Sequence, residues 1–477
     1  MHRGSELPKT PWLCGQRVDN AWSHGPVKRN KAQSMKKNYY LRGVQFLRFL
    51  RETGMRSGLK LVRRKIKEAL GLPEGGSPGK GHGPIRCETF NSRRFIHTAP
   101  IAVHPVPKPD APRVTLITDS VGAGSLFGGV GTALLLGILM ANRINGTLRI
   151  LTRTEWPDGN QVGSVLSAYG ISPDREVQLA FSPLTSNESA KRSQSIDVHE
   201  GELFLTTSWW STAAALASLP PASVFYLLQE DERMFYPFGD ERLLCETTLA
   251  RSDIRYVVNT RLLYEHLKGT GLPHLEHCGM CFEPSFPATL FHRRAVRAGA
   301  KRRFFFYARP NNPRNLFHLG IAVMERAVSE GILNAEEWEI CFVGKGIPCL
   351  VLSEGFEPRR IEGLGWEAYA ELIGSVDLGL SLMYTPHPSY PPLDLAASGA
   401  VVVTNKFGVK QDLSQYSPNI ICADPNIDSL VEAIRQGVAR VEALTSADQT
   451  GRQNGIGPAW PVAFSGVLNK MFPSRPC

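Results

Sequence analysis

Short apolar segments alternate with helical segments along this chain, and the alternation runs twice. The first run contains predicted strands at residues 114–117, 148–151, 177–181, 203–206 and 223–228. The second contains predicted strands at residues 304–307, 338–343, 377–382, 401–404 and 420–422. Strands separated by helices predict a parallel sheet with helices on both faces. The sequence therefore predicts two doubly wound α/β domains, joined near residues 285–300.

The charge of the chain is concentrated in its N-terminal part. The 477 residues carry a formal net charge of +10, yet residues 1–94 alone hold 21 Lys and Arg against 6 Asp and Glu. Beyond them, 33 basic residues face 38 acidic ones, so the body is not predicted to bind nucleic acid. Residues 39–72 form a basic amphipathic pattern, typical of a surface helix on an anionic membrane. A helix packed on the body, or an ordinary solvated basic face, is the alternative.

The cysteines and the apolar runs bear on localisation. The 9 cysteines are scattered and odd in number, which favours a reducing compartment. No apolar run reaches the ~18 residues that a membrane span requires, and no signal-peptide pattern is present. We expect a cytoplasmic protein, and a peripheral position on the inner face of the cell membrane if the basic extension binds lipid.

A glycine-rich turn between Leu126 and Thr132 follows the first strand and opens a helix. Gly128 and Gly129 let backbone N–H groups approach a ligand closely. The helix N-terminus adds partial positive charge, which suits a phosphate or a sugar oxygen. The alternative is a tight strand-to-helix turn without a ligand.

Two arginines follow the first strand of the second domain. Arg309 and Arg314 stand in a proline-stiffened loop, residues 307–315, where a diphosphate would be clamped. Arg suits this task because its planar fork binds two oxygens at once. A solvated loop with surface arginines is the alternative.

A proline-rich loop at residues 385–400 leads from a strand into a helix predicted to begin near Pro392. Asp394 would lie in the first turn, where a carboxylate is favoured, and could accept a hydrogen bond from a sugar hydroxyl. Tyr390 could stack on a base, and its alternative is core packing. His387 could bind a phosphate or a sugar, or have a purely structural role.

An acidic stretch, residues 229–236, directly follows the strand at residues 223–228. Carboxylates at the carboxyl end of a strand face the cleft of such a fold, and one of them could deprotonate an acceptor hydroxyl. A solvated acidic turn is the alternative. Cys278 and Cys281 lack a second pair at zinc-finger spacing, so we expect incidental thiols in a linker and no metal.

Taken together, these motifs resemble the WsaF-type rhamnosyltransferases, bacterial glycosyltransferases of the GT-B fold. The resemblance extends over about residues 114–441 and leaves the basic extension uncovered. It rests on four segments, of which the last contains the most specific run: residues 127–133, 229–237, 306–310 and 381–405. It implies a nucleotide-sugar donor, typically dTDP-L-rhamnose, and a glycan or lipid-linked glycan as acceptor.

The resemblance also implies roles for individual residues. It places Arg309 on the donor diphosphate, Gly128 and Gly129 under the sugar or diphosphate, and Tyr390 and Asp394 on the nucleoside. It places Glu230 and Glu232 toward the acceptor. The sequence departs from the family where Asp394 replaces a Glu, Glu230 replaces an Asp and Trp366 replaces a basic residue. Lys345, in the segment Val343–Gly346, is the candidate substitute for that lost charge.

The predicted organisation has four parts: a basic extension (residues 1–95), an N-terminal acceptor domain (96–295), a C-terminal nucleotide-sugar domain (296–458), and a last helix (459–477) that packs back on the first domain. We expect metal-independent transfer of a deoxysugar without a cofactor, because Arg side chains and helix dipoles can carry the leaving diphosphate. The alternatives are a non-catalytic nucleotide- or glycan-binding subunit and a sugar-nucleotide epimerase.

Overall fold

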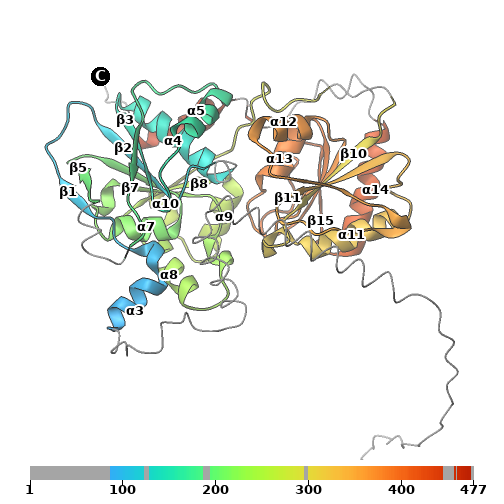
Figure 1. Ribbon diagram of the computed structural model, residues 1–477, viewed down its shortest axis with the longest axis horizontal. Helices are drawn as coiled ribbons and strands as arrows, with labels where there is room; N and C mark the ends of the chain where they lie inside the picture. The colour runs from blue at the N-terminus through green and yellow to red at the C-terminus, as the bar shows by residue number, and fades with distance from the viewer. Residues whose placement is uncertain are drawn as a thin grey trace, which may run out of the picture. The chain divides into compact units, whose positions relative to one another are not determined.

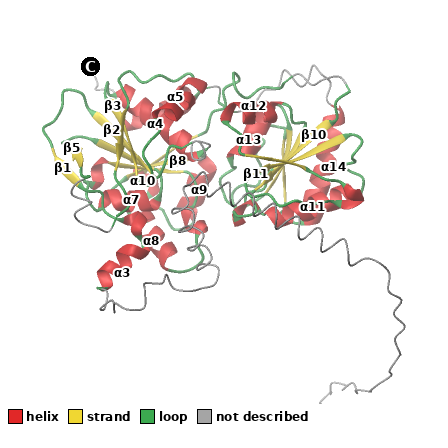
Figure 2. Ribbon diagram, viewed as in Figure 1, coloured by secondary structure: helices red, strands yellow, loops and turns green. Residues whose placement is uncertain are grey.

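The computed structural model describes residues 86–122, 128–185, 194–294, 299–443, 456–457 and 459–473. Two large sheets account for most of the strands among these residues, and all pairings within both sheets are parallel. Helices cover both faces of each sheet (Figures 1 and 2). The amphipathic pattern at residues 39–72 lies outside the described residues.

The N-terminal sheet has seven strands in the order β4-β3-β2-β6-β7-β8-β9. Its strands are β2 (Arg113–Thr118), β3 (Thr147–Thr152), β4 (Gln178–Phe181), β6 (Leu203–Thr206), β7 (Val224–Leu228), β8 (Arg255–Asn259) and β9 (Gly279–Phe282). Its helices are α4 (Gly129–Arg143), α5 (Gly159–Ala168), α7 (Trp209–Leu216), α8 (Asp240–Leu249), α9 (Arg261–Gly269) and α10 (Leu275–Cys278). The strand order reverses between β2 and β6, which makes their carboxyl ends the switch point where doubly wound folds bind ligands.

Shorter elements flank this sheet. They are α3 (Cys87–Arg94), β1 (Val103–Pro105) and β5 (Ile196–Val198), with the 3-10 turns η1 (Ile96–Thr98), η2 (Pro221–Ser223) and η3 (Glu232–Phe235). β1 and β5 pair in parallel as a small separate sheet.

The alternation of side chains along each strand explains the two-faced packing. In β2, Leu116 packs with α4 and α5 in one core, whereas Ile117 packs with α7, α9 and α10 in another. Successive side chains of a strand point to opposite faces, and both are fully buried here. A strand covered on both faces is therefore continuously apolar, the pattern by which it was predicted.

The C-terminal sheet has six strands in the order β12-β11-β10-β13-β14-β15. They are β10 (Arg302–Ala308), β11 (Trp338–Gly344), β12 (Arg359–Glu362), β13 (Leu378–Leu380), β14 (Val401–Asn405) and β15 (Ile420–Ala423). The helices are α11 (Phe317–Ser329) and α14 (Ile427–Ala443) on one face, and α12 (Trp366–Gly374) and α13 (Tyr390–Ala397) on the other. The 3-10 turns η4 (Pro313–Asn315) and η5 (Ser353–Gly355) complete the domain. Its switch point lies between β10 and β13.

The last helix, α16 (Trp460–Met471), packs on the N-terminal sheet. Its Phe464 ring lies 4.6 Å from that of Phe282 in β9, and Trp460 belongs to the same core as α4. Two Rossmann-like domains of this kind are the GT-B fold that the sequence predicts. No helix in the described part of the chain combines the length and apolarity needed to cross a bilayer.

The sequence reading missed β8, β9 and β12. β12 is an edge strand with mostly exposed polar side chains, so it lacks the apolar pattern of a buried strand. Cys278 ends α10 and Cys281 lies in β9, so the expectation of a linker there is wrong. β9 pairs with β8 and forms one edge of the N-terminal sheet.

Candidate functional site

A pocket of ≈710 Å³ lies at the carboxyl ends of strands from both domains. From the N-terminal domain it is lined mainly by the start of α4 and by Gln229 and Glu230, which follow β7. From the C-terminal domain it is lined by the ends of β10 and β11, by residues 361–364, and by the loop that leads into α13. This position at the switch point is where a doubly wound fold binds ligands.

The glycine turn forms one wall of the pocket. Gly128 has a φ of +85°, a conformation that L side chains rarely adopt. α4 begins at Gly129, three residues before the predicted Thr132, so its free N–H groups lie within the turn. A Cβ at Gly129 would lie 3.0 Å from the Gln229 Nε2 atom. The Gln229 amide donates to the Gly129 carbonyl at 2.8 Å and fixes the turn against β7.

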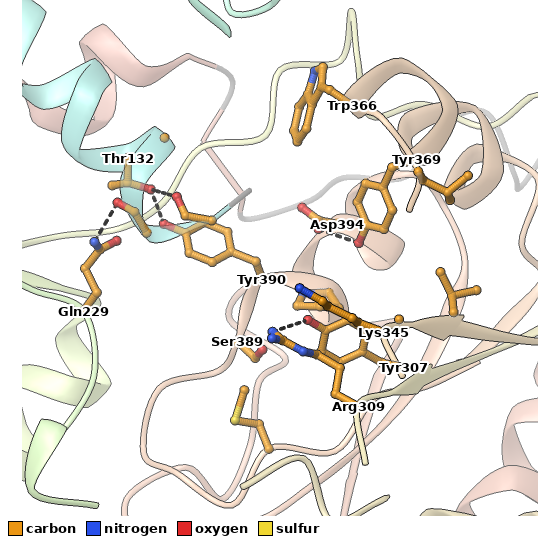
Figure 3. A pocket seen from close by; sticks show the side chains of 18 of the residues that line it. Thr132, Gln229, Tyr307, Arg309, Lys345, Trp366, Tyr369, Ser389, Tyr390 and Asp394 are labelled. Atoms are coloured by element: carbon orange, nitrogen blue, oxygen red, sulfur yellow. Dashed lines mark hydrogen bonds between the residues drawn. The ribbon is translucent and has the colours of Figure 1, made fainter. Parts of the chain in front are cut away.

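Tyr390 joins the two domains across the pocket. Its hydroxyl lies 2.5 Å from Thr132 Oγ1 in α4 and accepts a hydrogen bond from Asn259 Nδ2 at 2.8 Å. Figure 3 shows the Tyr390 ring reaching toward Thr132. The edge of the ring also lies against the bare backbone of Gly128, where a Cβ would come within 3.7 Å. The hydroxyl is therefore occupied by protein partners, a role that the sequence did not predict.

A strained turn presents Tyr390 to the pocket. Ser389 precedes it with a φ of +71°, which is unusual for a residue other than glycine. The Ser389 N–H donates to His387 Nδ1 at 2.9 Å, which stabilises the turn. The His387 side chain is buried, with 2% of its surface exposed, and burial lowers the pKa of its imidazole to about 3. His387 is consequently neutral, with its Nδ1 accepting and its Nε2 carrying the proton.

The predicted cationic residues separate into two groups. Arg309 and Lys345 line the pocket at the ends of β10 and β11, and their side chains lie near each other in Figure 3. Arg309 donates to the Tyr307 hydroxyl at 3.4 Å. Arg314 does not line the pocket: its guanidinium stacks over Phe235 at 4.1 Å, and its Nη1 lies 3.8 Å from Glu230 Oε1. Burial and the nearby charge of Arg309 lower the pKa of the Arg314 guanidinium, so the two side chains are close, and a contact of Arg314 with the diphosphate stays a prediction.

Asp394 lines the pocket from α13. The helix begins at Tyr390, so Asp394 lies in the second turn and not in the predicted first turn. Its Oδ2 accepts a hydrogen bond from the Tyr369 hydroxyl at 2.9 Å. Burial raises the pKa of the Asp394 carboxyl to about 8, with the Tyr369 bond opposing that rise. The helix N-terminus therefore contributes less to this carboxyl than the sequence suggested.

Glu230 lies where the two domains meet. Burial raises the pKa of its carboxyl to about 7, against the attraction of Arg314. Its Oε1 faces Arg314 and accepts a long hydrogen bond from Thr385 at 3.5 Å. A carboxyl with a pKa near neutrality is suited to proton transfer at physiological pH.

Glu232 is not part of this pocket. It is 4% exposed and accepts a hydrogen bond at 2.8 Å from the backbone N–H of Trp209, the first residue of α7. Burial raises the pKa of its carboxyl to about 8. Glu232 begins η3, and its buried carboxyl faces the start of α7 and not the pocket, so its predicted contact with the acceptor stays a prediction. Asp231 is bound by Arg233 and His266 and likewise lies outside the pocket.

Several lining residues were missed by the sequence analysis. Aromatic rings form one side of the pocket: Tyr169 lies 5.4 Å from Trp366 and 6.2 Å from Trp460. These three residues are far apart in the sequence, so no local pattern connects them. Two further residues were missed that support the site without lining the pocket. Asn259 holds the Tyr390 hydroxyl and offered a signal, since it is a polar residue at the end of an apolar strand. Lys410 is fully buried and donates to the Met383 carbonyl at 2.8 Å.

Within the described residues, no group of three or more His, Cys, Asp or Glu side chains is arranged to hold a metal ion. The pocket contains Glu230, Glu362, His387 and Asp394 among its lining residues. Its cationic groups are Arg309 and Lys345. Arg309 and Lys345 can thus bind an anionic group at the ends of β10 and β11, and Glu230 can bind a polar group.

Known proteins resemble both the sequence and the fold. O-antigen biosynthesis protein RfbC of Myxococcus xanthus is 32% identical over 278 residues, which cover 56% of this chain and 21% of that protein. The chain therefore spans about a fifth of the length of this relative. Sucrose-phosphate synthase from Thermosynechococcus elongatus is 14% identical, with a TM-score of 0.48, over 76% of this chain and 97% of its own. HepE from Anabaena, in complex with UDP and glucose, is 11% identical, with a TM-score of 0.49, over 76% and 99%.

Family descriptions match each domain separately. "WsaF, N-terminal domain" matches residues 113–261, and "WsaF, C-terminal domain" matches residues 302–435. The two matches follow the order of the two sheets and include the glycine turn, Glu230, Arg309 and the loop before α13. With both of its Rossmann-like domains matched in sequence, the chain belongs to the WsaF family.

Proposed function

We propose that this protein is a glycosyltransferase that moves a deoxysugar, L-rhamnose from dTDP-L-rhamnose, onto a glycan acceptor in cell-surface polysaccharide biosynthesis. The observation that carries the proposal is the pocket between the two Rossmann-like domains of a WsaF-family chain, with cations at its strand ends and a carboxyl opposite. The RfbC relative, an O-antigen biosynthesis protein, supports the polysaccharide context.

In this proposal the diphosphate lies between the ends of β10 and β11. Arg309 and Lys345 line this part of the pocket and are both exposed to it. An Arg fork binds two phosphoryl oxygens, and a Lys ammonium adds a point charge. The N-terminus of α4, with the bare backbone of Gly128 and Gly129, offers N–H groups from the other side.

The nucleoside is proposed to lie toward α13 and α12. Asp394, held by Tyr369, is the candidate partner of a ribose hydroxyl. Trp366 and Tyr169 supply aromatic surface beside it. Tyr390 also lines the pocket, so its ring remains the predicted contact of the nucleoside, while its hydroxyl is held by Thr132 and Asn259 of the N-terminal domain.

Glu230 is the proposed catalytic base. The acceptor hydroxyl gives its proton to the Glu230 carboxylate while its oxygen bonds to the anomeric carbon of the donor. The bond from that carbon to the diphosphate breaks, and its electron pair leaves with the nucleoside diphosphate. Arg309 and Lys345 stabilise the charge that develops on the leaving group, which is electrostatic catalysis. The two domains exclude the water that would otherwise hydrolyse the donor.

The test is incubation of the purified chain with a panel of nucleotide sugars and a rhamnose-terminated oligosaccharide. We expect dTDP release and an extended glycan with dTDP-L-rhamnose, and unchanged rates after EDTA treatment. Donor binding without turnover would instead indicate a non-catalytic subunit. Conversion of the donor sugar without any acceptor would indicate an epimerase. Loss of activity with EDTA would refute the metal-independent step.

A further inference from the structure

Buried polar atoms of the pocket that lack hydrogen-bond partners among the described residues include Nε2 of His387 and Oε2 of Glu230, besides the indole Nε1 of Trp460. The imidazole and the carboxylate are the two that flank the loop before α13. Both residues line the same pocket, one from the C-terminal domain and one from the N-terminal domain. Buried polar groups are nearly always hydrogen-bonded, so an unpaired pair in a pocket points to a ligand group that completes it.

The two atoms have complementary roles. His387 Nδ1 accepts the Ser389 N–H, so the neutral ring must carry its proton on Nε2 and can only donate there. Glu230 Oε1 is turned toward Arg314 and Thr385, which leaves Oε2 as an acceptor when the carboxyl is ionised. One donor and one acceptor are therefore both unsatisfied.

Thr385 brings the two residues together. Its hydroxyl lies 3.5 Å from Glu230 Oε1 and 3.5 Å from the carbonyl oxygen of His387. The Ser389 N–H, in a residue with a φ of +71°, fixes the imidazole through its Nδ1. Burial raises the pKa of the Glu230 carboxyl, and the charges of Arg314 and Lys410 oppose that rise.

We propose that His387 Nε2–H and Glu230 Oε2 form a site for one sugar hydroxyl, which accepts from the imidazole and donates to the carboxylate. A hydroxyl is the group that donates and accepts at once. A phosphoryl oxygen can accept from His387 but cannot donate to Glu230 and would be repelled by it. The inference rests on the proposed function, since the hydroxyl belongs either to the transferred sugar or to the acceptor.

Two variants of His387 separate its two nitrogens. His387→Asn retains an acceptor near the Nδ1 position for the Ser389 N–H but removes the Nε2 donor. His387→Gln retains a donor near the Nε2 position and removes the Nδ1 acceptor. Thermal unfolding of both variants reports on the turn, and titration calorimetry with dTDP and with dTDP-L-rhamnose reports on the pocket.

The sugar gain is the factor by which dTDP-L-rhamnose binds more tightly than dTDP alone. If the hydroxyl belongs to the transferred sugar, His387→Asn lowers this gain about 3- to 10-fold, the effect of one hydrogen bond, while dTDP alone binds as before. If it belongs to the acceptor, the gain persists and the KM for the oligosaccharide rises about 3- to 10-fold. In both cases His387→Gln should stay closer to the wild-type value than His387→Asn does.

Other outcomes overturn the proposal. An equal loss of affinity for dTDP and for dTDP-L-rhamnose would place His387 on the diphosphate. An unchanged sugar gain together with an unchanged acceptor KM would leave the imidazole without a ligand. Wild-type protein that binds neither dTDP nor dTDP-L-rhamnose would instead refute the proposed donor, which is a separate failure.

Discussion

Replacing Tyr390 with Phe removes the hydroxyl that joins the two domains and leaves the ring in place. The hydroxyl bonds Thr132 at 2.5 Å and Asn259 at 2.8 Å, and Asn259 is fully buried. An uncharged hydrogen bond contributes ~0.5–1.5 kcal/mol, and the substitution removes two of them. Asn259 Nδ2 retains a longer bond to Gln229 Oε1 at 3.4 Å, so it is not left unpaired. The variant should therefore lose ~1–3 kcal/mol of the free energy that holds the domains in this arrangement.

The pocket is built from both domains, so this loss should also appear in donor binding. A change of ~1–3 kcal/mol corresponds to a 5- to 150-fold change in an equilibrium constant. We expect Tyr390→Phe to unfold at a lower temperature and to bind dTDP-L-rhamnose correspondingly more weakly. Thermal unfolding and titration calorimetry measure the two effects.

Tyr256→Phe is the matched control. Its hydroxyl is also buried and donates to the carbonyls of Leu249 and Arg251, at 3.0 and 2.8 Å, all within the N-terminal domain. This variant should lose stability but retain donor affinity. The reasoning fails if Tyr390→Phe unfolds and binds like the wild type, or if Tyr256→Phe weakens donor binding as much.

Three further predictions concern single side chains. Arg309→Ala should lower dTDP affinity by ~1.5–3 kcal/mol, as expected for charged hydrogen bonds, and calorimetry showing no change would remove Arg309 from the diphosphate site. Gly128→Ala should destabilise the protein by ~1–3 kcal/mol because its φ of +85° and ψ of −117° lie in a region that L residues rarely adopt, whereas Gly163→Ala, in α5 with open space around it, should not. Burial raises the pKa of Glu232 to about 8 in the folded state, so the folded protein binds the extra proton between the ordinary Glu pKa and pH 8. Stability should therefore fall as the pH rises from about 5 to 8; Glu232→Gln should flatten that fall in pH-dependent urea unfolding, and an unchanged slope would contradict the assignment.

Much of the fold could be predicted because its signals are local. The segment Phe304–Phe306 is apolar on both faces of a strand, and its side chains indeed enter two different cores. Gly128 and Gly129 marked a strand-to-helix turn through backbone freedom alone. Arg309 was correctly placed at a strand end, because parallel strands bring their carboxyl ends to one edge of the sheet.

The functions of the side chains within the site were decided by tertiary contacts. Glu230 and Glu232 are equivalent in the sequence, yet one lines the pocket and the other bonds the first N–H of α7, because Glu232 begins the 3-10 turn η3 and Glu230 precedes it. Tyr390 bonds residues 258 and 131 positions away.

The sequence by itself determined most of the strands and helices, their order and the presence of two α/β domains, since apolar periodicity and glycine conformation act over a few residues. Only the tertiary structure decided which polar atoms are paired and which, like His387 Nε2, remain open to a ligand. Pairing and burial depend on groups that the folded chain brings together from both domains.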